Sequence, residues 1–578
     1  IILASCMVGF GYFAAGKTMQ AVLLKDPVNY TIEEQRMVAE FAEFRELQAL
    51  ISEQTASAEQ NEHFQVLENR HTTGELRGYV SYLSDSPLTF YILYGAIVAF
   101  YIIFGGFRAA VVTNLVQGVL IIVFSFILIP YGIIQLGGFS GLHQSVPAQM
   151  FSLFGTSALS EYTWYSIAAM ILVAAVSVNG GFANMAAAGS ARNEYDARIG
   201  VVTGAFGKRF MMMAWAIAGL IAYGLFRDQI ADPDQTWGFL SQNLLGPGLI
   251  GLMMAGILAA NMSSMDASSI CISALFVRNL YTPIFPNRSE QHYVFVGRII
   301  IFVVLTAGLF IGMYATGLVS FIRMLLILPL AFGSVVVLIF LWRKLTVAAI
   351  YVEVASFLLI FAIVPVIVGG SMQMRMHPSL TLVGEPRIEI VDRNVRSGDR
   401  ADEQQGAAAM DPVPEYVEQP PLALFFDSVA WVNVDDPSEG TVGVGRFNVE
   451  VYMASLVGVP VERFSAAGLL ATRFIVSLIF PFAILLIVSQ FTRKPDKECL
   501  DRFFVRMKTP INVDLEKDAL AVEASYRNPH QFDHLKLFPK SSWEFCKWTR
   551  QDTVGFVLCW VAGFAVIGLF LWILQIGA

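Results

Sequence analysis

Two serines and an aspartate stand in an apolar stretch of the chain, GILAANMSSMDAS over residues 256–268. On an α-helix Ala260, Ser263 and Ser264 lie on one face, because residues three and four apart are neighbours there. Their carbonyl and hydroxyl oxygens suit a hard monovalent cation, which needs its lost hydration replaced without a full opposite charge. Small residues at this spacing also allow close helix packing and hydrogen bonds to the preceding turn. The residues alone leave both roles open.

Asp266 is the only charged side chain in this stretch. A charge near the centre of a membrane helix costs about 2.5–3.5 kcal/mol on insertion scales, so it usually has a partner or a task. Asp266 therefore binds a cation, carries a proton, accepts a hydrogen bond, or pairs with an arginine near the cytoplasmic end of its helix.

The composition predicts that a lipid bilayer surrounds these residues. Of the 578 residues, 56% are hydrophobic and 15% are charged, whereas a soluble protein carries about 25% charged residues. Apolar runs long enough to cross a bilayer recur along the chain. We expect an all-α membrane protein with eleven spans, at about residues 1–25, 88–104, 110–136, 163–187, 205–226, 246–270, 295–316, 319–341, 346–369, 465–490 and 553–576.

Charge and cysteine content exclude other classes. The net charge of −8 lies in the loops and indicates no nucleic-acid partner, and the five cysteines form no CxxC pair, so neither a disulfide framework nor a metal site is predicted. Lysines and arginines gather in alternate loops, as at Lys208, Arg209, Arg343 and Lys344. Because positive loops stay in the cytoplasm, we expect a multi-pass protein of the cell (plasma or inner) membrane with a cytoplasmic first residue and an external C-terminus.

The spans divide the chain into six parts. We expect a transporter core at 1–345 with an external helical loop at 26–87, a peripheral helix at 346–370, an external loop or cap at 371–462, a membrane helix at 463–491, a cytoplasmic segment at 492–552 and a C-terminal membrane helix at 553–578. Within the cap, RIEIVDRNV (387–395) and RFNVEVYM (446–453) predict short strands.

Four segments resemble the sodium/solute symporter family, the group that contains the sodium–glucose cotransporters. GGFRAAVVTNLVQG (105–118) is similar to that family's GGLxAVxxTDxxQ junction, and ARNEYDARIG (191–200) to a cytoplasmic loop. The stretch at 248–286, which begins GLIGLMMAGILAANMSSMDAS, resembles the family pattern most closely, and FLWRK (340–344) is similar to a motif after a later helix. The four segments follow one another in the family's order.

The resemblance implies a LeuT-type fold, two inverted five-helix repeats with substrate and ions near the membrane midplane. On that scheme 1–25 corresponds to the third core helix and 246–270 to the eighth, and the first three helices of a fourteen-helix plan have no counterpart. The chain opens inside a predicted span without an initiator Met, so we expect a missing N-terminal segment or a partner chain to supply core helices one and two.

The resemblance also implies two cation positions. The family's common sodium site uses oxygens that map onto Ala260, Ser263 and Ser264, with further carbonyls from core helix one. Some members hold a second cation with an aspartate on the fifth core helix, which is Asn114 here, and the facing position on the eighth helix is Asp266. A carboxylate on the opposite helix could still bind a second cation or carry a proton, or merely accept a hydrogen bond from Asn114.

The residues that would meet a solute depart from the sugar-transporting pattern. In VSVNGGFAN (176–184) small and apolar residues stand where those relatives have aromatic side chains. Asn179, Gly180 and Gly181 either form an unwound segment that lines a substrate cavity or make a notch for helix packing.

Together these patterns predict Na+-coupled symport of a small polar organic solute by alternating access. The alternative is a non-transporting subunit or sensor that reuses the fold. We do not expect an enzyme, because the chain contains no HExxH or GxSxG motif.

Overall fold

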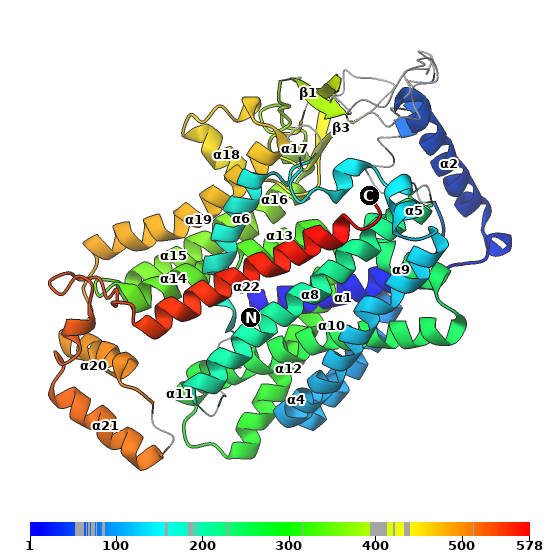
Figure 1. The fold of residues 1–578 in the computed structure, drawn as a ribbon. Helices are drawn as coiled ribbons and strands as arrows, with labels where there is room; N and C mark the ends of the chain where they lie inside the picture. The colour runs from blue at the N-terminus through cyan, green and yellow to red at the C-terminus, as the bar shows by residue number, and fades with distance from the viewer. Residues whose placement is uncertain are drawn as a thin grey trace.

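A computed structural model gives the fold of the chain (Figure 1). It describes all residues except 53–59, 61–62, 65, 68–69, 71–75, 77, 84–86, 156–159, 183–188, 190, 192, 228, 231, 316, 386, 394–412, 420–421, 433–439 and 512–513.

Long apolar helices dominate the described part of the chain. Ten of the helices there are long and apolar enough to cross a membrane, and the expected all-α membrane protein is confirmed. They are carried by α1 (Ile2–Val22), α4 (Leu88–Gln135), α8 (Glu194–Phe226), α10 (Pro247–Phe276), α12 (Glu290–Met313), α13 (Leu318–Ile327) with α14 (Leu330–Leu341), α15 (Val347–Leu358) with η6 (Leu359–Ile363) and α16 (Val364–Gly370), α19 (Ala466–Phe491) and α22 (Arg550–Leu574). The eleventh expected span is the shorter helix α6 (Trp164–Ser177), which continues into η3 (Val178–Gly180).

Shorter elements connect and cover the spans. Helix α10 continues through η5 (Val277–Tyr281) and α11 (Thr282–Ile284) to the end of its span at Ile284. Outside the membrane helices lie η1 (Pro27–Asn29), α2 (Ile32–Ser52), α5 (Phe139–Ser145), η2 (Ala148–Phe151), η4 (Pro233–Gln235), α9 (Thr236–Leu244), α17 (Met372–Arg375), α18 (Val449–Leu456), η8 (Val461–Arg463), α20 (Lys497–Lys508), α21 (Leu515–Arg527) and η9 (Asp533–Leu535). Strands β1 (Arg387–Arg393) and β2 (Val413–Gln419) form one antiparallel pair, and β3 (Ser428–Trp431) and β4 (Thr441–Val444) form another.

Helix α4 contains two spans, Leu88–Gly106 and Val112–Gln135, joined at a kink. Gly106 has φ +62° and ψ −164°, a left-handed conformation that residues with a Cβ rarely adopt. The break turns the second arm back along α10, so that both arms of α4 contact this helix. Gly106 therefore determines which side chains of the two arms can meet those of α10.

Helix α1 is the most enclosed of the spans and packs against α10, α12 and α4. Small residues make this possible. A Cβ on Gly308 of α12 would lie 2.4 Å from Val8 Cγ1, so the two helices approach closer than side chains would allow. The centre of the bundle is thus a close-packed set around α1, α4, α10 and α12.

A second packing centre joins α6, α14, α15 and α19 to described residues of the segment at 371–462, which we call the cap. Phe357, Phe426 and Phe474 from three parts of the chain are completely or almost completely buried there. One sequence expectation for the cap is wrong: RFNVEVYM is not a strand, because Val449–Leu456 forms α18. The buried side chains Val449, Val451 and Ala454 face α19 and its neighbours, and this tertiary packing overrides the β-propensity of the valines.

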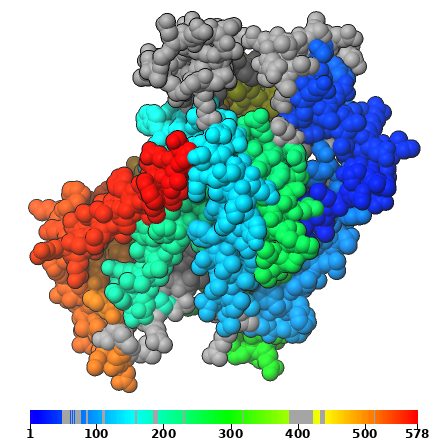
Figure 2. Space-filling view, turned by 45° about the vertical axis from the view of Figure 1, so that its right-hand side comes forward, coloured from blue at the N-terminus to red at the C-terminus, as the bar shows by residue number. Residues whose placement is uncertain are grey.

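Helix α22 lies on the outside of the bundle, against α8 (Figure 2). Only 6% of its most apolar window is buried inside the protein. A helix that is apolar all round and covered by so little protein requires a lipid environment.

Candidate cation site and cavities

The aspartate of α10 lies in the contact between α10 and both arms of α4. Asp266 is 0% exposed. From the first arm, the hydroxyl of Tyr101 donates a hydrogen bond to its Oδ2 over 3.0 Å and also lies 3.4 Å from the carbonyl of Met262. The structure therefore buries this carboxylate deep between two spans and gives one of its oxygens a donor.

The second arm of α4 brings Asn114 to the same carboxylate, and the two side chains interact. Asn114 Oδ1 and Asp266 Oδ1 are both buried and have no hydrogen-bond partner in the described structure. Gln117, one turn further along the same arm, also has a buried Oε1 without a partner. Leaving a buried polar atom unmatched costs about 1–3 kcal/mol, so the unmatched oxygens of Asp266 and Asn114, whose side chains interact, make this contact a candidate site for a cation, a proton or water.

The charges around the site favour a positive ligand. No ion pair joins Asp266 to a lysine or arginine among the residues that the structure describes. Among the described side chains, no arginine pairs with Asp266 as the helix-end alternative requires; the side chain of Arg108 lies outside them. A carboxylate oxygen and two amide oxygens are ligands that hard cations take.

The three residues expected to form the common sodium site lie on the adjoining face of α10. Ser263 is half-buried, Ser264 is exposed, and no hydrogen bond of either hydroxyl is found in the described part of the chain. Ala260 lies one turn before Ser264 and lines a cavity of about 260 Å³. The structure brings the three residues onto one face and places no second group of ligands opposite them within the described residues.

The cavity beside Ala260 combines aromatic walls with polar side chains. Trp215 of α8 and Trp237 of α9 contribute to it, and Trp215 Nε1 donates a hydrogen bond to Ser125 Oγ over 2.8 Å. The amide nitrogen of Asn261 donates back to the carbonyl of Ile257 over 3.1 Å. This bond leaves the Asn261 oxygen as an acceptor, and no charged side chain lines the cavity.

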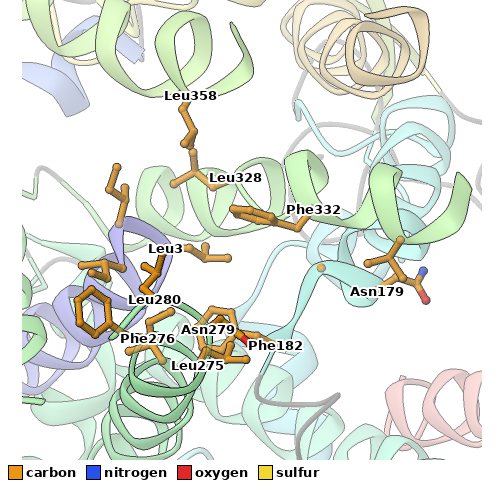
Figure 3. A pocket seen from close by; sticks show the side chains of 15 residues that line it. Leu3, Asn179, Phe182, Leu275, Phe276, Asn279, Leu280, Leu328, Phe332 and Leu358 are labelled. Atoms are coloured by element: carbon orange, nitrogen blue, oxygen red, sulfur yellow. The ribbon is translucent and has the colours of Figure 1, made fainter. Parts of the chain in front are cut away.

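A larger cavity of about 570 Å³ lies at the end of α6 (Figure 3). Asn179 and Gly180 line it, and Phe182 follows them, but most of the other lining residues are leucine, isoleucine and phenylalanine. The amide of Asn179 points away from the labelled apolar side chains (Figure 3) and donates to the carbonyls of its own helix at Ala175 and Val176, over 2.9 and 3.3 Å. This cavity is therefore largely apolar.

Both readings of the glycine pair find a counterpart in the geometry. The helix ends here, because η3 is a 3-10 turn and Gly181 has φ −74° and ψ 88°. A Cβ on Gly180 would lie 2.2 Å from the carbonyl oxygen of Pro329 and 2.9 Å from the nitrogen of Gly333. Gly180 thus forms a tight crossing with the start of α14, while Gly181 carries the chain out of the helix.

Sequence reasoning did not identify Tyr101, Gln117, Asn261 and Trp215. Tyr101 and Gln117 are ordinary residues of apolar helices when the sequence is taken alone. The only available signal was that Asn114 and Gln117 are three residues apart and so share one helix face. Which neighbouring helix that face meets depends on the bend at Gly106.

These features define a polytopic α-helical membrane protein with a buried polar contact between two spans and two mainly apolar cavities. Residues 88–351 match the family model of the sodium:solute symporter family. The family resemblance expected from the sequence is confirmed over that range, which contains α4, α10 and all the candidate site residues. None of the curated proteins compared matches this chain.

Proposed function

We propose that this protein takes up a small polar organic solute by Na+-coupled symport, with alternating access through a LeuT-type bundle. The observation that carries the proposal is the coincidence of the family match with a set of buried, unmatched oxygens inside it, at Asp266, Asn114 and Gln117. Members of this family couple solute movement to sodium, and such oxygens are suited to a hard cation.

The proposal uses two cation positions. The first uses the backbone oxygen of Ala260 and the hydroxyls of Ser263 and Ser264. The second uses Asp266 and Asn114, with Gln117 as a further oxygen and Tyr101 as the donor that orients the carboxylate. A negative side chain at the second position gives it an electrostatic preference for a cation or a proton over water.

The exposed face of Ser264 supports a further partner. Sodium needs about six oxygen ligands as a hard cation of this kind, and three come from α10. We propose that another helix, from an N-terminal segment or a partner chain, packs against this face as core helices one and two and completes the site.

The solute fits the smaller cavity better than the larger one. The 260 Å³ cavity offers Thr18, Ser125 and Asn261 for hydrogen bonds and the rings of Trp215 and Trp237 for apolar contact. Small-molecule sites typically combine a mainly apolar wall with a few placed polar groups. With no charge in the lining, a neutral polar solute is favoured over an ion. The segment at Asn179, Gly180 and Gly181 would then border the pathway at the other cavity.

Transport is tested in proteoliposomes of stated lipid composition with an inward sodium gradient. A panel of labelled neutral solutes is offered with sodium, with potassium, and with sodium plus an ionophore that collapses the gradient. Uptake that requires the sodium gradient supports the proposal. Sodium-dependent thermal stabilisation without flux of any solute would favour the sensor or subunit instead, and no response to sodium in either assay would reject both.

A further inference from the structure

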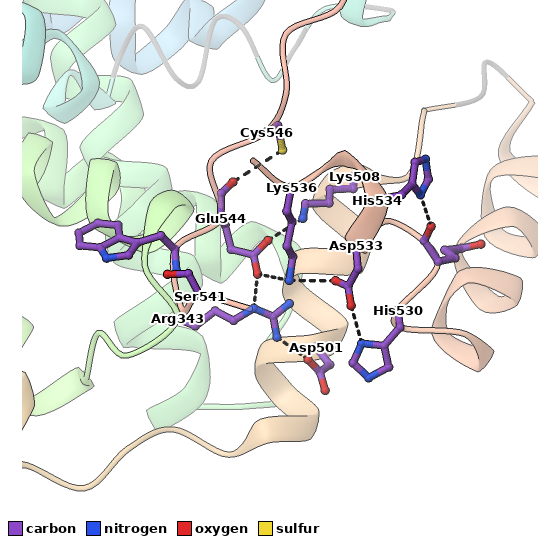
Figure 4. Close-up of polar contacts among 12 residues, drawn as sticks. Arg343, Asp501, Lys508, His530, Asp533, His534, Lys536, Ser541, Glu544 and Cys546 are labelled. Carbon is purple, nitrogen blue, oxygen red and sulfur yellow. Dashed lines mark hydrogen bonds and ion pairs between the residues drawn. The ribbon is translucent and has the colours of Figure 1, made fainter. Parts of the chain in front are cut away.

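Glu544 is a fully buried acid in the segment at 492–552, outside the membrane-spanning helices. Its side chain is 0% exposed. Lys508 Nζ lies 2.6 Å from Oε2, Lys536 Nζ lies 2.8 Å from Oε1, and Arg343 Nε also donates to Oε1 (Figure 4). Three cations from three separate parts of the chain therefore converge on one carboxylate.

The backbone joins the same two regions. Arg343 lies directly after α14, and its N–H donates to the carbonyl of Ser542 over 2.9 Å. In return the N–H of Glu544 donates to the carbonyl of Leu341 over 2.8 Å. The bridge between them pairs Trp342 with Trp543, whose rings stack at a centroid distance of 5.7 Å. The end of α14 and residues 541–544 thus form a short antiparallel pair.

A second ring of charges balances the first. Asp501 of α20 lies 2.6 Å from Arg343, and Asp533 lies 2.9 Å from Lys536. The guanidinium of Arg343 also lies over the ring of Phe504 at 4.8 Å. Three cations and three carboxylates make a neutral cluster, which we call the Glu544 clasp: Arg343, Asp501, Lys508, Asp533, Lys536 and Glu544.

The clasp holds Glu544 in its ionised form. Burial alone would raise the pKa of this carboxyl, but hydrogen bonds from Lys508, Lys536 and Arg343 hold the pKa below its ordinary value. A buried ion cluster contributes little net stability compared with apolar packing, whereas removing one partner leaves the others uncompensated. Such a cluster therefore fixes geometry more than it adds stability.

The far side of α14 reaches the helices around the larger cavity. Helix α14 packs against α6 and η3, where Gly333 and Gly180 meet. Phe332 and Val336 of α14 line the 570 Å³ cavity. A displacement of the clasp end of α14 is therefore transmitted along one short helix to the cavity and the end of α6.

We infer that Glu544 is a positioning residue for transport: it fixes the segment at 492–552 to the end of α14, so that the segment and this helix move as one body. The inference rests on the proposed transport function, because its consequence is the rate of the transport cycle. The expected role is mechanical and involves no contact with solute or sodium.

The test compares Glu544→Gln with Glu498→Gln in proteoliposomes. Glu498 lies on α20 in the same segment, and its ion pair with Arg502 is largely exposed, so its loss should change nothing. Glu544→Gln should lower the maximal uptake rate per folded protein about tenfold, because three cations lose their shared anion, with the KM for solute and sodium unchanged. A purely structural role would lower the yield or melting temperature but leave the rate per folded protein as in the wild type.

An engineered disulfide tests whether the attachment itself, rather than the carboxylate, sets the transport rate. Trp342 and Trp543 face each other in the antiparallel pair, and the backbone hydrogen bonds are made by the residues on either side of them. In such a non-hydrogen-bonded pair the Cα atoms lie about 4.5 Å apart, which is within the range of a disulfide. In a Cys546→Ser background, Trp342→Cys with Trp543→Cys and Glu544→Gln should recover the lost rate when oxidised and lose it again when reduced. If Glu544→Gln does not fold, Arg343→Gln should give a smaller loss of rate, because Glu544 keeps two lysines.

The outcomes separate the two proposals. If the wild type shows sodium-driven uptake, two results would overturn the positioning role alone. Either Glu544→Gln transports at the wild-type rate, or its rate is reduced and the oxidised disulfide fails to restore it. Wild-type vesicles without sodium-driven uptake of any solute would overturn the proposed function itself.

Discussion

A carboxylate and an amide face each other across the contact of α4 and α10. The resemblance implies that some family members carry a carboxylate at the position of Asn114, whereas here that position is an amide and the acid is Asp266 on the facing helix. Both keep an unmatched oxygen, although Tyr101 satisfies the other oxygen of the acid. In the proposed cation site, exchanging the charged and the neutral ligand leaves the total charge unchanged, so we expect cation binding to survive the exchange.

The exchange predicts a specific pattern of rescue. Asp266→Ser should remove one coupled charge per solute, while Asp266→Ser with Asn114→Asp should restore it, because the carboxylate returns to the other helix at the same site. Asp266→Asn keeps the shape but removes the titratable group. The charge moved per solute is measured from reversal potentials in proteoliposomes.

Ser273→Ala is the matched control, since Ser273 lies on α10 but donates to Gly297 of α12. A double variant that stays uncoupled, or an Asp266→Ser variant with normal coupling, would contradict the exchange.

The common sodium site makes a separate prediction. Ser263→Ala with Ser264→Ala should weaken apparent sodium affinity at least about tenfold, or about 1.4 kcal/mol, because two ligand hydroxyls are lost. Sodium-dependent thermal stabilisation of the purified protein measures it without any solute. If sodium stabilises the double variant as much as the wild type, these serines are not sodium ligands and serve helix packing instead.

At the residue scale, the structure brings the side chains of Asp266 and Asn114 into contact, while their role in binding a cation stays a prediction. Helical spacing and the family resemblance were enough to pair Asp266 with Asn114. Tyr101 could not be found in this way, because its approach to the acid depends on how the first arm of α4 packs on α10, and this arm ends at the break at Gly106.

At the scale of elements, α14 connects most of the features described above. One of its ends crosses η3 at Gly180 and the other enters the Glu544 clasp. The segments VSVNGGFAN and FLWRK lie at these two contacts, but nothing in the sequence indicated that one helix joins them. The strand predicted at 446–453 failed for a related reason: its alternating valines are buried on a helix by contacts from α19.

The crossing at Gly180 predicts a steric effect on stability. Gly180→Ala should destabilise the protein by about 1–3 kcal/mol, because the new Cβ would meet the backbone oxygen of Pro329 at 2.2 Å. Gly204→Ala on α8 is the control, since nothing lies within 4 Å of its Cβ position. Thermal unfolding in detergent compares the two. Equal melting temperatures would show that the crossing is loose.

The clasp predicts a dependence of stability on pH. Glu544 has a pKa below its ordinary value of 4.5, so its contribution is fully present above the unfolded-state pKa and is lost as the pH falls through the folded-state pKa. From pH 8 to pH 6 this group should therefore contribute a constant stability. Below about pH 4.5 the wild type should lose stability more steeply than Glu544→Gln, whose amide does not titrate. Parallel acid unfolding curves would contradict the ionised, clasped state.

At the scale of the whole molecule, the sequence predicted the number and order of the spans closely, because length and hydropathy are local properties. Contacts between distant segments were not predictable. The packing of α19 on α6, where Tyr165 and Ser465 are 300 residues apart, and the docking of residues 541–544 on the end of α14 both unite distant stretches of the chain. Helix α22 shows the reverse, since it was predicted as a span and has few protein neighbours.

The distribution of positive loops predicts one orientation for this assembly, with the segment at 492–552 in the cytoplasm and the cap outside. Cys499 and Cys546 of the cytoplasmic segment are both exposed, and Val457, in the turn after α18, is 82% exposed. In intact cells a membrane-impermeant maleimide should label Val457→Cys and leave Cys499 and Cys546 unmodified, in a background with the other cysteines changed to serine. Permeabilised cells should label all three sites, because exposure rather than the membrane then decides access. If Cys499 is labelled in intact cells and Val457→Cys is not, the orientation is the reverse of the predicted one and the Glu544 clasp lies outside the cell.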